Sequence, residues 1–172
     1  MDQAFPIQNT CGVLNMKSNL AHISDQEKHP SLSRDNSVLK DFTTEDALSI
    51  TSNGYKFSLA FKRILWSASD KKCAYCGDDI PTHKEMRVDH FIPKSRNGIE
   101  CITNYVCSCD VCNSIKGSKS LEDFRVGYSL RNSILCGIIQ PSQAKQLLEL
   151  GVVLPMEIQD FYFEKIANGG VL

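Results

Sequence analysis

The 172-residue sequence contains no apolar run that approaches the roughly 20 residues needed to cross a bilayer. Its first residues, M-D-Q-A-F-P, also lack the basic and apolar regions of a secretory signal. We therefore expect a chain that makes no membrane contact and works in the reducing cytoplasm. At this length the chain can bury a hydrophobic core of ordinary size, so it does not need a metal merely to reach a viable size.

The sequence also lacks a strong net charge, since Lys and Arg nearly balance Asp and Glu and leave a formal charge of -1 at pH 7. This balance argues against a protein that binds nucleic acid through a broadly basic surface. Any affinity for phosphate must therefore come from local clusters of basic side chains.

Cysteine, by contrast, is plentiful, with eight residues in the chain. In a reducing compartment two C-x-x-C pairs favour metal ligation over disulfides, and four thiolates suit one tetrahedral zinc ion. Such a closed site is structural and leaves no open position for catalysis. Gly77 suits the tight turn of the first pair, and Cys107 remains an alternative ligand. The four expected zinc ligands are Cys73, Cys76, Cys109 and Cys112.

The rest of the chain divides into three parts. We expect a weakly structured extension over residues 1–55, with a short helix beginning near residues 41–44 and a turn at 53–54. Residues 56–125 form the central domain, which opens with an amphipathic helix from residue 57 to 68. Residues 126–172 form a helical extension. A helix that follows Ser120 leads into it, and further helices begin at Pro141 and at Pro155.

The 32 residues between the two cysteine pairs are more than a zinc ribbon needs, so they house something further. M-R-V-D-H-F-I reads as a strand stopped by Pro93. S-R-N-G indicates a turn, and I-E-C-I-T-N-Y-V reads as a second strand or an extended loop. A helix then opens through V-C-N-S-I-K-G. We predict an α+β fold with a small ββα core clamped by the four-cysteine zinc site and flanked by helices.

D-H-F-I-P-K-S-R-N-G, then Asn104, then C-D-V-C-N-S-I-K-G resembles the HNH endonucleases, in the branch with four zinc-binding cysteines. The resemblance covers about 45 residues. The spacings of 14 positions from His90 to Asn104 and of 9 positions from Asn104 to Asn113 both suit the family pattern. Two positions depart from the usual pattern. Asn113 stands where many members have His, and Asn97 precedes Gly98 where two glycines are usual.

The resemblance implies a ββα-metal core and a role for each signature residue. His90 would be the general base, and Asp89 and Asn113 would bind one catalytic divalent ion. Oxygen ligands of this kind suit Mg²⁺ or Mn²⁺. Asn104 would hold the loop that directs His90. Because adjacent residues of a regular strand point to opposite faces, Asp89 and His90 share a site only if the strand end twists or bends.

Several basic residues flank this motif, and we expect them to meet the phosphates of DNA. Each of them alone is better explained as a solvated surface charge. They are Lys94, Arg96, Lys116 and Lys119.

The sequence therefore predicts a metal-dependent HNH endonuclease that hydrolyses DNA phosphodiester bonds and leaves 5′-phosphate and 3′-hydroxyl ends. Two alternatives stay open: a zinc-stabilised interaction module that performs no hydrolysis, and a nuclease subunit of a defence or restriction assembly. The C-terminal helices either wrap the core or form the surface for a homodimer or a partner protein.

Overall fold

The computed structural model describes residues 35–39, 42–52 and 54–169. Most of the N-terminal extension expected over 1–55 therefore lies outside the described residues. The described part holds six α-helices and two two-stranded sheets, after a short 3-10 turn at Asn36–Val38. In chain order these are α1 (Thr44–Ala47), β1 (Leu48–Thr51), β2 (Gly54–Phe57), α2 (Leu59–Ala68), β3 (Arg87–His90), β4 (Tyr105–Ser108), α3 (Asp110–Lys116), α4 (Leu121–Arg131), α5 (Pro141–Glu149) and α6 (Tyr162–Ala167).

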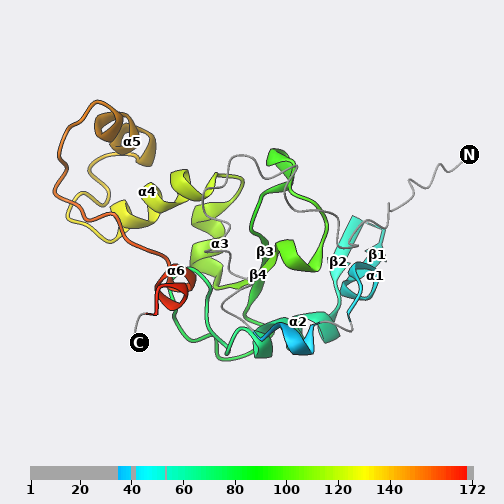
Figure 1. Cartoon of the computed structure of the whole chain (residues 1–172). Helices are drawn as coiled ribbons and strands as arrows, with labels where there is room; N and C mark the ends of the chain where they lie inside the picture. The colour runs from blue at the N-terminus through cyan, green and yellow to red at the C-terminus, as the bar shows by residue number, and fades with distance from the viewer. Residues whose placement is uncertain (1–34, 40–41, 53, 170–172) are drawn as a thin grey trace, which may run out of the picture.

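The centre of the molecule is the predicted ββα unit, formed by β3, β4 and α3 (Figure 1). The two strands are antiparallel, with Asp89 opposite Val106 and His90 opposite Tyr105. Helix α3 follows β4 after one residue, Cys109, which is its N-cap. The ion pair between Arg87 and Asp110, 2.7 Å long, joins the start of β3 to the start of α3. The α+β class and the ββα core are thus confirmed.

A β-hairpin precedes the central unit and was not predicted. The short helix is α1, whose capping box pairs Thr43 with Asp46. Strands β1 and β2 follow, with Leu48 opposite Phe57. Phe57 packs edge-on against Tyr105, at 4.9 Å between ring centroids, which joins the hairpin to the central sheet. The boundary expected between residues 55 and 56 thus falls inside β2.

Helix α2 occupies the segment predicted to be an amphipathic helix. Ser58 caps its N-terminus through a hydrogen bond from the Phe61 amide. The buried face consists of Phe61, Leu65 and Ala68. This face packs under the central sheet, where the rings of Phe61 and Tyr105 lie 5.6 Å apart.

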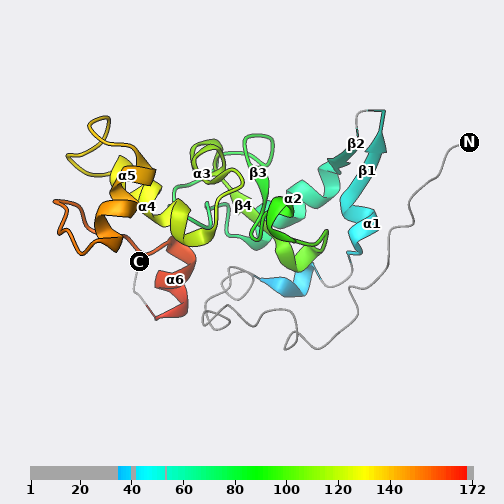
Figure 2. The ribbon, with the colours of Figure 1, turned by 90° about the horizontal axis from the view of Figure 1, so that it is seen from above.

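Of the C-terminal helices, α4 and α5 lie at one end of the molecule, opposite the β1–β2 hairpin (Figures 1 and 2). Ser120 caps α4 and Pro141 opens α5, as predicted. The prediction that a helix begins at Pro155 is wrong, because α6 begins only at Tyr162. The backbone before it is bonded elsewhere: Gln159 N donates to Ser129 Oγ, and Gln159 O accepts from Arg125 Nη1. These bonds to α4 replace those that a helix would make.

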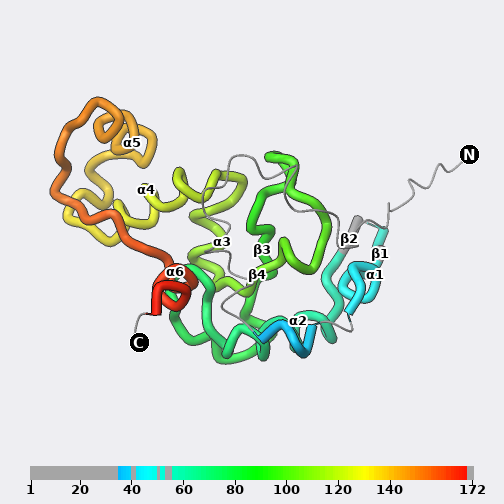
Figure 3. Tube along the Cα trace, in the orientation of Figure 1, coloured from blue at the N-terminus to red at the C-terminus, as the bar shows by residue number. Residues whose placement is uncertain are grey.

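Helix α6 packs against the first cysteine pair, far from it in sequence (Figure 3). Phe163 N donates to Ala74 O and Tyr162 N donates to Tyr75 O, at 3.0 and 2.8 Å. A buried bidentate ion pair between Arg125 and Glu164 ties α6 to α4. Of the C-terminal helices, α6 therefore wraps the core. Among the described residues, no helix is long and apolar enough to cross a membrane.

Candidate metal centre and catalytic site

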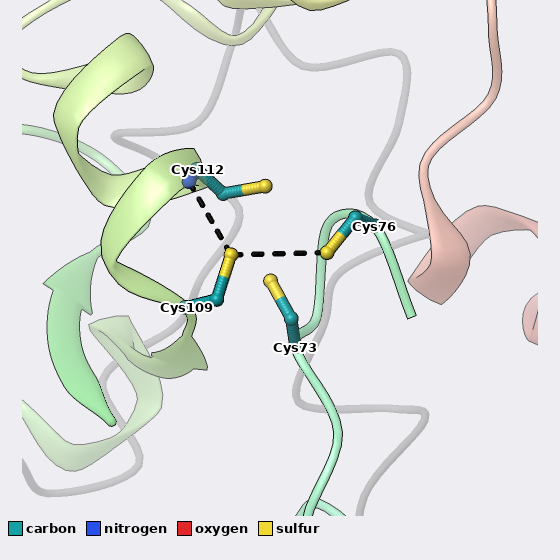
Figure 4. A group of neighbouring side chains, drawn as sticks. All are labelled: Cys73, Cys76, Cys109 and Cys112. Atoms are coloured by element: carbon teal, nitrogen blue, oxygen red, sulfur yellow. Dashed lines mark hydrogen bonds between the residues drawn. The ribbon is translucent and has the colours of Figure 1, made fainter. Parts of the chain in front are cut away.

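Two segments that are distant in sequence bring the four predicted zinc ligands together. One pair follows α2, and the other begins α3. Their four Sγ atoms all lie within 4.8 Å of one another (Figure 4). A tetrahedral zinc with Zn–S bonds of about 2.3 Å would separate its sulfurs by about 3.8 Å. The separation of Cys76 Sγ and Cys109 Sγ is 3.8 Å, so the four donors fit zinc in number, chemistry and spacing.

The first cysteine turn depends on Gly77, which has a positive φ of 81°. A Cβ at this position would also lie 2.6 Å from the ring of Tyr162 in α6. Cys107 takes no part in the cluster, because it is buried with its Sγ 4.0 Å from Met86 Sδ. Glycine is therefore required at position 77. The cluster consists of the four predicted ligands and does not include Cys107.

Asp89 is buried beside the cysteine cluster. Its Oδ2 accepts a hydrogen bond of 2.6 Å from the hydroxyl of Tyr75. Tyr75 lies between Cys73 and Cys76, in the turn formed by the first cysteine pair (the first knuckle). The same oxygen is 2.9 Å from Lys116 Nζ, whose side chain is fully buried. Burial and the Asp89 carboxylate raise the pKa of Tyr75 well above its ordinary value, so its hydroxyl remains a donor. The Asp89 carboxylate thus contacts both the first cysteine turn, through Tyr75, and helix α3, through Lys116.

Asn113 lies on α3, three residues before Lys116. Residues at this spacing share a helical face, so Asn113 lies on the same face as the lysine that reaches Asp89. Its side chain is half-buried. Asp89 and Asn113 offer carboxylate and amide oxygens, the donor types that Mg²⁺ and Mn²⁺ prefer. The hydrogen bond and the ion pair described for Asp89 both use its Oδ2 atom.

His90 faces a different set of side chains. Its Nε2 lies 2.9 Å from Glu100 Oε2, and its ring packs edge-on against Tyr105 at 5.1 Å. Burial lowers the pKa of His90 below its ordinary value, and the charges of Lys94 and Lys116 act in the same direction while Asp89 opposes them. Glu100 is itself paired with Lys94, which compensates its negative charge. A neutral imidazole can accept a proton near neutral pH.

The side chains of Asp89 and His90 thus leave β3 toward different partners, as in a regular strand. Strand β3 ends at His90, so the backbone leaves the regular strand directly after these two residues. Lys116 Nζ bridges the two residues, because it also donates a hydrogen bond of 2.7 Å to His90 O. The link between the two predicted catalytic residues is therefore this buried ammonium group.

Asn104 makes the backbone hydrogen bonds expected of it. Its Oδ1 accepts from Ile92 N at 2.8 Å, and its Nδ2 donates to Ile92 O and Ile99 O at 3.0 and 2.9 Å. A Cβ on Gly98 would lie 1.8 Å from Ile92 O, so only glycine fits there. Asn97 adopts a left-handed φ of 63°. Together these residues hold both sides of the loop that follows His90.

The four basic residues proposed to meet phosphate differ in exposure. Lys94 and Arg96 are about half exposed, but Lys94 pairs with Glu100, and Arg96 reaches Ser118 O and Asp123. Lys119 donates to Ile115 O in the last turn of α3. Lys116 is fully buried. Its ammonium group is committed to Asp89 and His90 and does not face solvent.

Three residues of the site were not predicted from the sequence. Tyr75 supplies the hydroxyl that donates to Asp89, and Glu100 supplies the carboxylate that contacts His90. Tyr105 supplies the hydroxyl that donates to Glu100. Tyr75 stands between two predicted ligands, and Tyr105 follows Asn104, so their positions next to signature residues were the available hint. Glu100 looked like an ordinary charged residue in a loop.

In a comparison with known protein families, residues 73–119 match the family model described as HNH endonuclease. Neither the curated proteins nor the solved structures contain a match to the chain. The matched residues begin at the first zinc-ligand candidate, include the ββα unit and end just after α3. Residues 73–119 are therefore similar to HNH endonuclease domains, and the four-cysteine cluster is consistent with the zinc-binding branch of that family.

Proposed function

We propose that this chain is a metal-dependent endonuclease that hydrolyses DNA phosphodiester bonds at the β3–β4–α3 unit. The observation that carries the proposal is the placement of a half-buried histidine, His90, at the end of β3 inside the HNH domain. One of its ring nitrogens is bonded to a carboxylate, which leaves the other as a base. Zinc at the cysteine cluster would have a structural role only, because four thiolates leave no open position.

The proposed reaction uses the ring of His90 as general base. A water molecule gives one proton to a ring nitrogen of His90, so an O–H bond breaks and an N–H bond forms. The water oxygen bonds to phosphorus as the bond from phosphorus to the 3′ oxygen breaks. The electron pair of that bond goes to the 3′ oxygen, which takes a proton from solvent. The products carry a 5′-phosphate and a 3′-hydroxyl.

Asp89 and Asn113 would hold the catalytic divalent ion through a carboxylate oxygen and an amide oxygen. When bound, Mg²⁺ or Mn²⁺ supplies positive charge that stabilises the phosphate and the departing oxygen. Lys116, buried against Asp89, fixes the carboxylate and the backbone of His90. Asn104 holds the loop after His90. Lys94, Arg96 and Lys119 remain the proposed contacts to the DNA backbone.

One observation favours a second function, a zinc-stabilised module without hydrolytic activity. The Oδ2 atom of Asp89 already accepts from Tyr75 and Lys116, and the residue is 7% exposed. A carboxylate used only to join the zinc knuckle to α3 would have the same surroundings. Under this alternative Asp89 supports the fold and binds no second metal.

A plasmid-nicking assay with the zinc-loaded protein separates the two functions. The endonuclease predicts cleavage that requires added Mg²⁺ or Mn²⁺, with zinc content unchanged throughout. It also predicts that Asp89→Ala abolishes binding of a second metal, which is measurable by calorimetry with Mn²⁺. Intact plasmid under all metal conditions, together with no Mn²⁺ binding, would favour the non-catalytic module.

A further inference from the structure

Glu100 lies in the loop between Gly98 and Asn104, and each of its carboxylate oxygens meets a different neighbour. Its Oε2 is 2.9 Å from His90 Nε2 and accepts a hydrogen bond of 2.6 Å from the hydroxyl of Tyr105. Its Oε1 is paired with the ammonium group of Lys94. The Glu100 side chain is 28% exposed and that of His90 is 17% exposed, so this contact is partly shielded from water.

The chemistry of the two groups sets which nitrogen of His90 carries the proton. A carboxylate only accepts hydrogen bonds, so the nitrogen that faces it must be protonated. The neutral ring therefore carries its proton on Nε2 and keeps the lone pair on Nδ1. Nδ1 is then the nitrogen able to take a proton from water.

Tyr105 fixes both members of the contact. It lies opposite His90 in the β3–β4 register and is completely buried. Burial raises its pKa to about 12, so the hydroxyl stays protonated and donates to Glu100. Phe57 lies 6.1 Å from the imidazole ring, between centroids. The ring of His90 is thus flanked by two aromatic side chains and one carboxylate.

The backbone beside Glu100 is fixed as well. Asn104 Nδ2 donates to the carbonyl of Ile99, the residue before Glu100. Gly98, two residues before Glu100, is in close contact with Ile92 O. The loop that carries Glu100 is therefore bound to the loop that leaves His90.

We propose that Glu100 is a positioning residue that holds His90 in the tautomer protonated on Nε2 and so presents Nδ1 to the attacking water. This inference rests on the proposed endonuclease function. Glu100 contacts neither the DNA nor the scissile phosphate. It acts through the orientation of His90 and by balancing the positive charge that the ring gains when it accepts the proton.

Nitrogen-15 NMR of His90 tests the tautomer directly, without DNA and without the catalytic ion. The zinc-loaded protein is measured at a pH where imidazole is neutral. We expect the Nε2-protonated form to dominate in the wild type and in Glu100→Gln, whose amide oxygen still accepts. We expect Glu100→Ala to shift the ring toward a mixture of tautomers. An unchanged tautomer in Glu100→Ala would overturn the proposal.

Cleavage kinetics on a duplex of fixed sequence provide the second measurement. Loss of a residue that orients a catalytic group typically costs about 10–100-fold, so we expect a decrease of this size in kcat for Glu100→Ala. Glu100→Gln should be intermediate, and KM should stay within about twofold of the wild type. The matched control is Glu85→Ala, because Glu85 is exposed and bonds only Thr82 among the described residues. Equal kcat in Glu100→Ala and the control would overturn the proposal.

The variant His90→Ala, assayed in parallel, distinguishes the two levels of inference. Wild-type cleavage by His90→Ala means that the endonuclease assignment itself has failed. An inactive His90→Ala together with an unaffected Glu100→Ala means that only the positioning role is wrong. Equal zinc content and equal melting temperature in all variants exclude a loss of folding as the cause.

Discussion

Lys116 Nζ lies 2.9 Å from Asp89 Oδ2, and both side chains are buried. Removing a charge from water is costly, and a buried pair recovers this cost only with good geometry and further hydrogen bonds. Here Tyr75 donates to the same carboxylate, and Lys116 also donates to His90 O. The pair therefore connects the zinc knuckle, the end of β3 and the end of α3 at one point.

Replacing Lys116 by methionine should destabilise the zinc-loaded protein by about 3–5 kcal/mol, because Asp89 is left buried without its cation. Urea unfolding measures the change. The control is Lys119→Met, which alters a partly exposed lysine three residues on, and which we expect to change stability by less than about 1 kcal/mol. The double variant Asp89→Asn, Lys116→Met should recover part of the loss. Equal stability of Lys116→Met and the control would mean that the pair is unimportant.

The cysteine cluster should bind one zinc ion per chain, and Cys109→Ser should lose it. Zinc binding is linked to folding free energy, so we expect the melting temperature of this variant to fall by about 10 °C or more. Metal analysis and thermal unfolding measure both effects. Cys136→Ser is the control, since Cys136 is exposed and remote from the cluster. A Cys109→Ser protein that keeps its zinc and its melting temperature would contradict the assignment.

Gly98→Ala should destabilise the protein by about 1–3 kcal/mol or more, because the new Cβ would meet Ile92 O at 1.8 Å. The comparison is Gly127→Ala inside α4, where the nearest atom to a new Cβ is 3.7 Å away. There we expect a gain of about 0.5–1 kcal/mol, because alanine favours a helix. Denaturant unfolding of both variants provides the test, and Gly98→Ala with wild-type stability would show that the loop relaxes freely.

Arg125→Met should destabilise the protein by about 3–5 kcal/mol, because Glu164 is left buried without a partner cation. Arg131→Met, on the exposed last turn of α4, is the matched control. Hydrogen exchange followed by mass spectrometry should show loss of protection in α6 for Arg125→Met alone. Unchanged protection there would mean that α6 is held by its aromatic contacts without the ion pair.

Local patterns in the sequence predicted much of the site. The two C-x-x-C pairs, the helix through Phe61 and the loop-holding role of Asn104 each depend on spacing that is visible along the chain. The fixed distances from His90 to Asn104 and Asn113 placed the ββα unit. Each of these features is set within a short segment or by a repeated motif.

The side chains that contact the predicted catalytic residues come from other segments of the chain, and the sequence does not show how these segments pack together. Lys116 appeared to be a surface lysine, yet helix α3 turns it into the core beside Asp89. Glu100 reaches His90 only because the β3–β4 loop folds back. Packing between segments also explains the backbone before Tyr162. Pro155 favoured a helix locally, but Gln159 makes its backbone hydrogen bonds to residues of α4.

Plasmid cleavage by His90→Ala tests the central claim most directly. The variant and the wild type are assayed at equal zinc content with Mg²⁺ and with Mn²⁺, and His83→Ala serves as a control outside the site. Loss of a general base typically costs about 10²–10⁴-fold, so we expect His90→Ala to be at least this much slower while His83→Ala cuts normally. Cleavage by His90→Ala at the wild-type rate would contradict the proposed endonuclease mechanism.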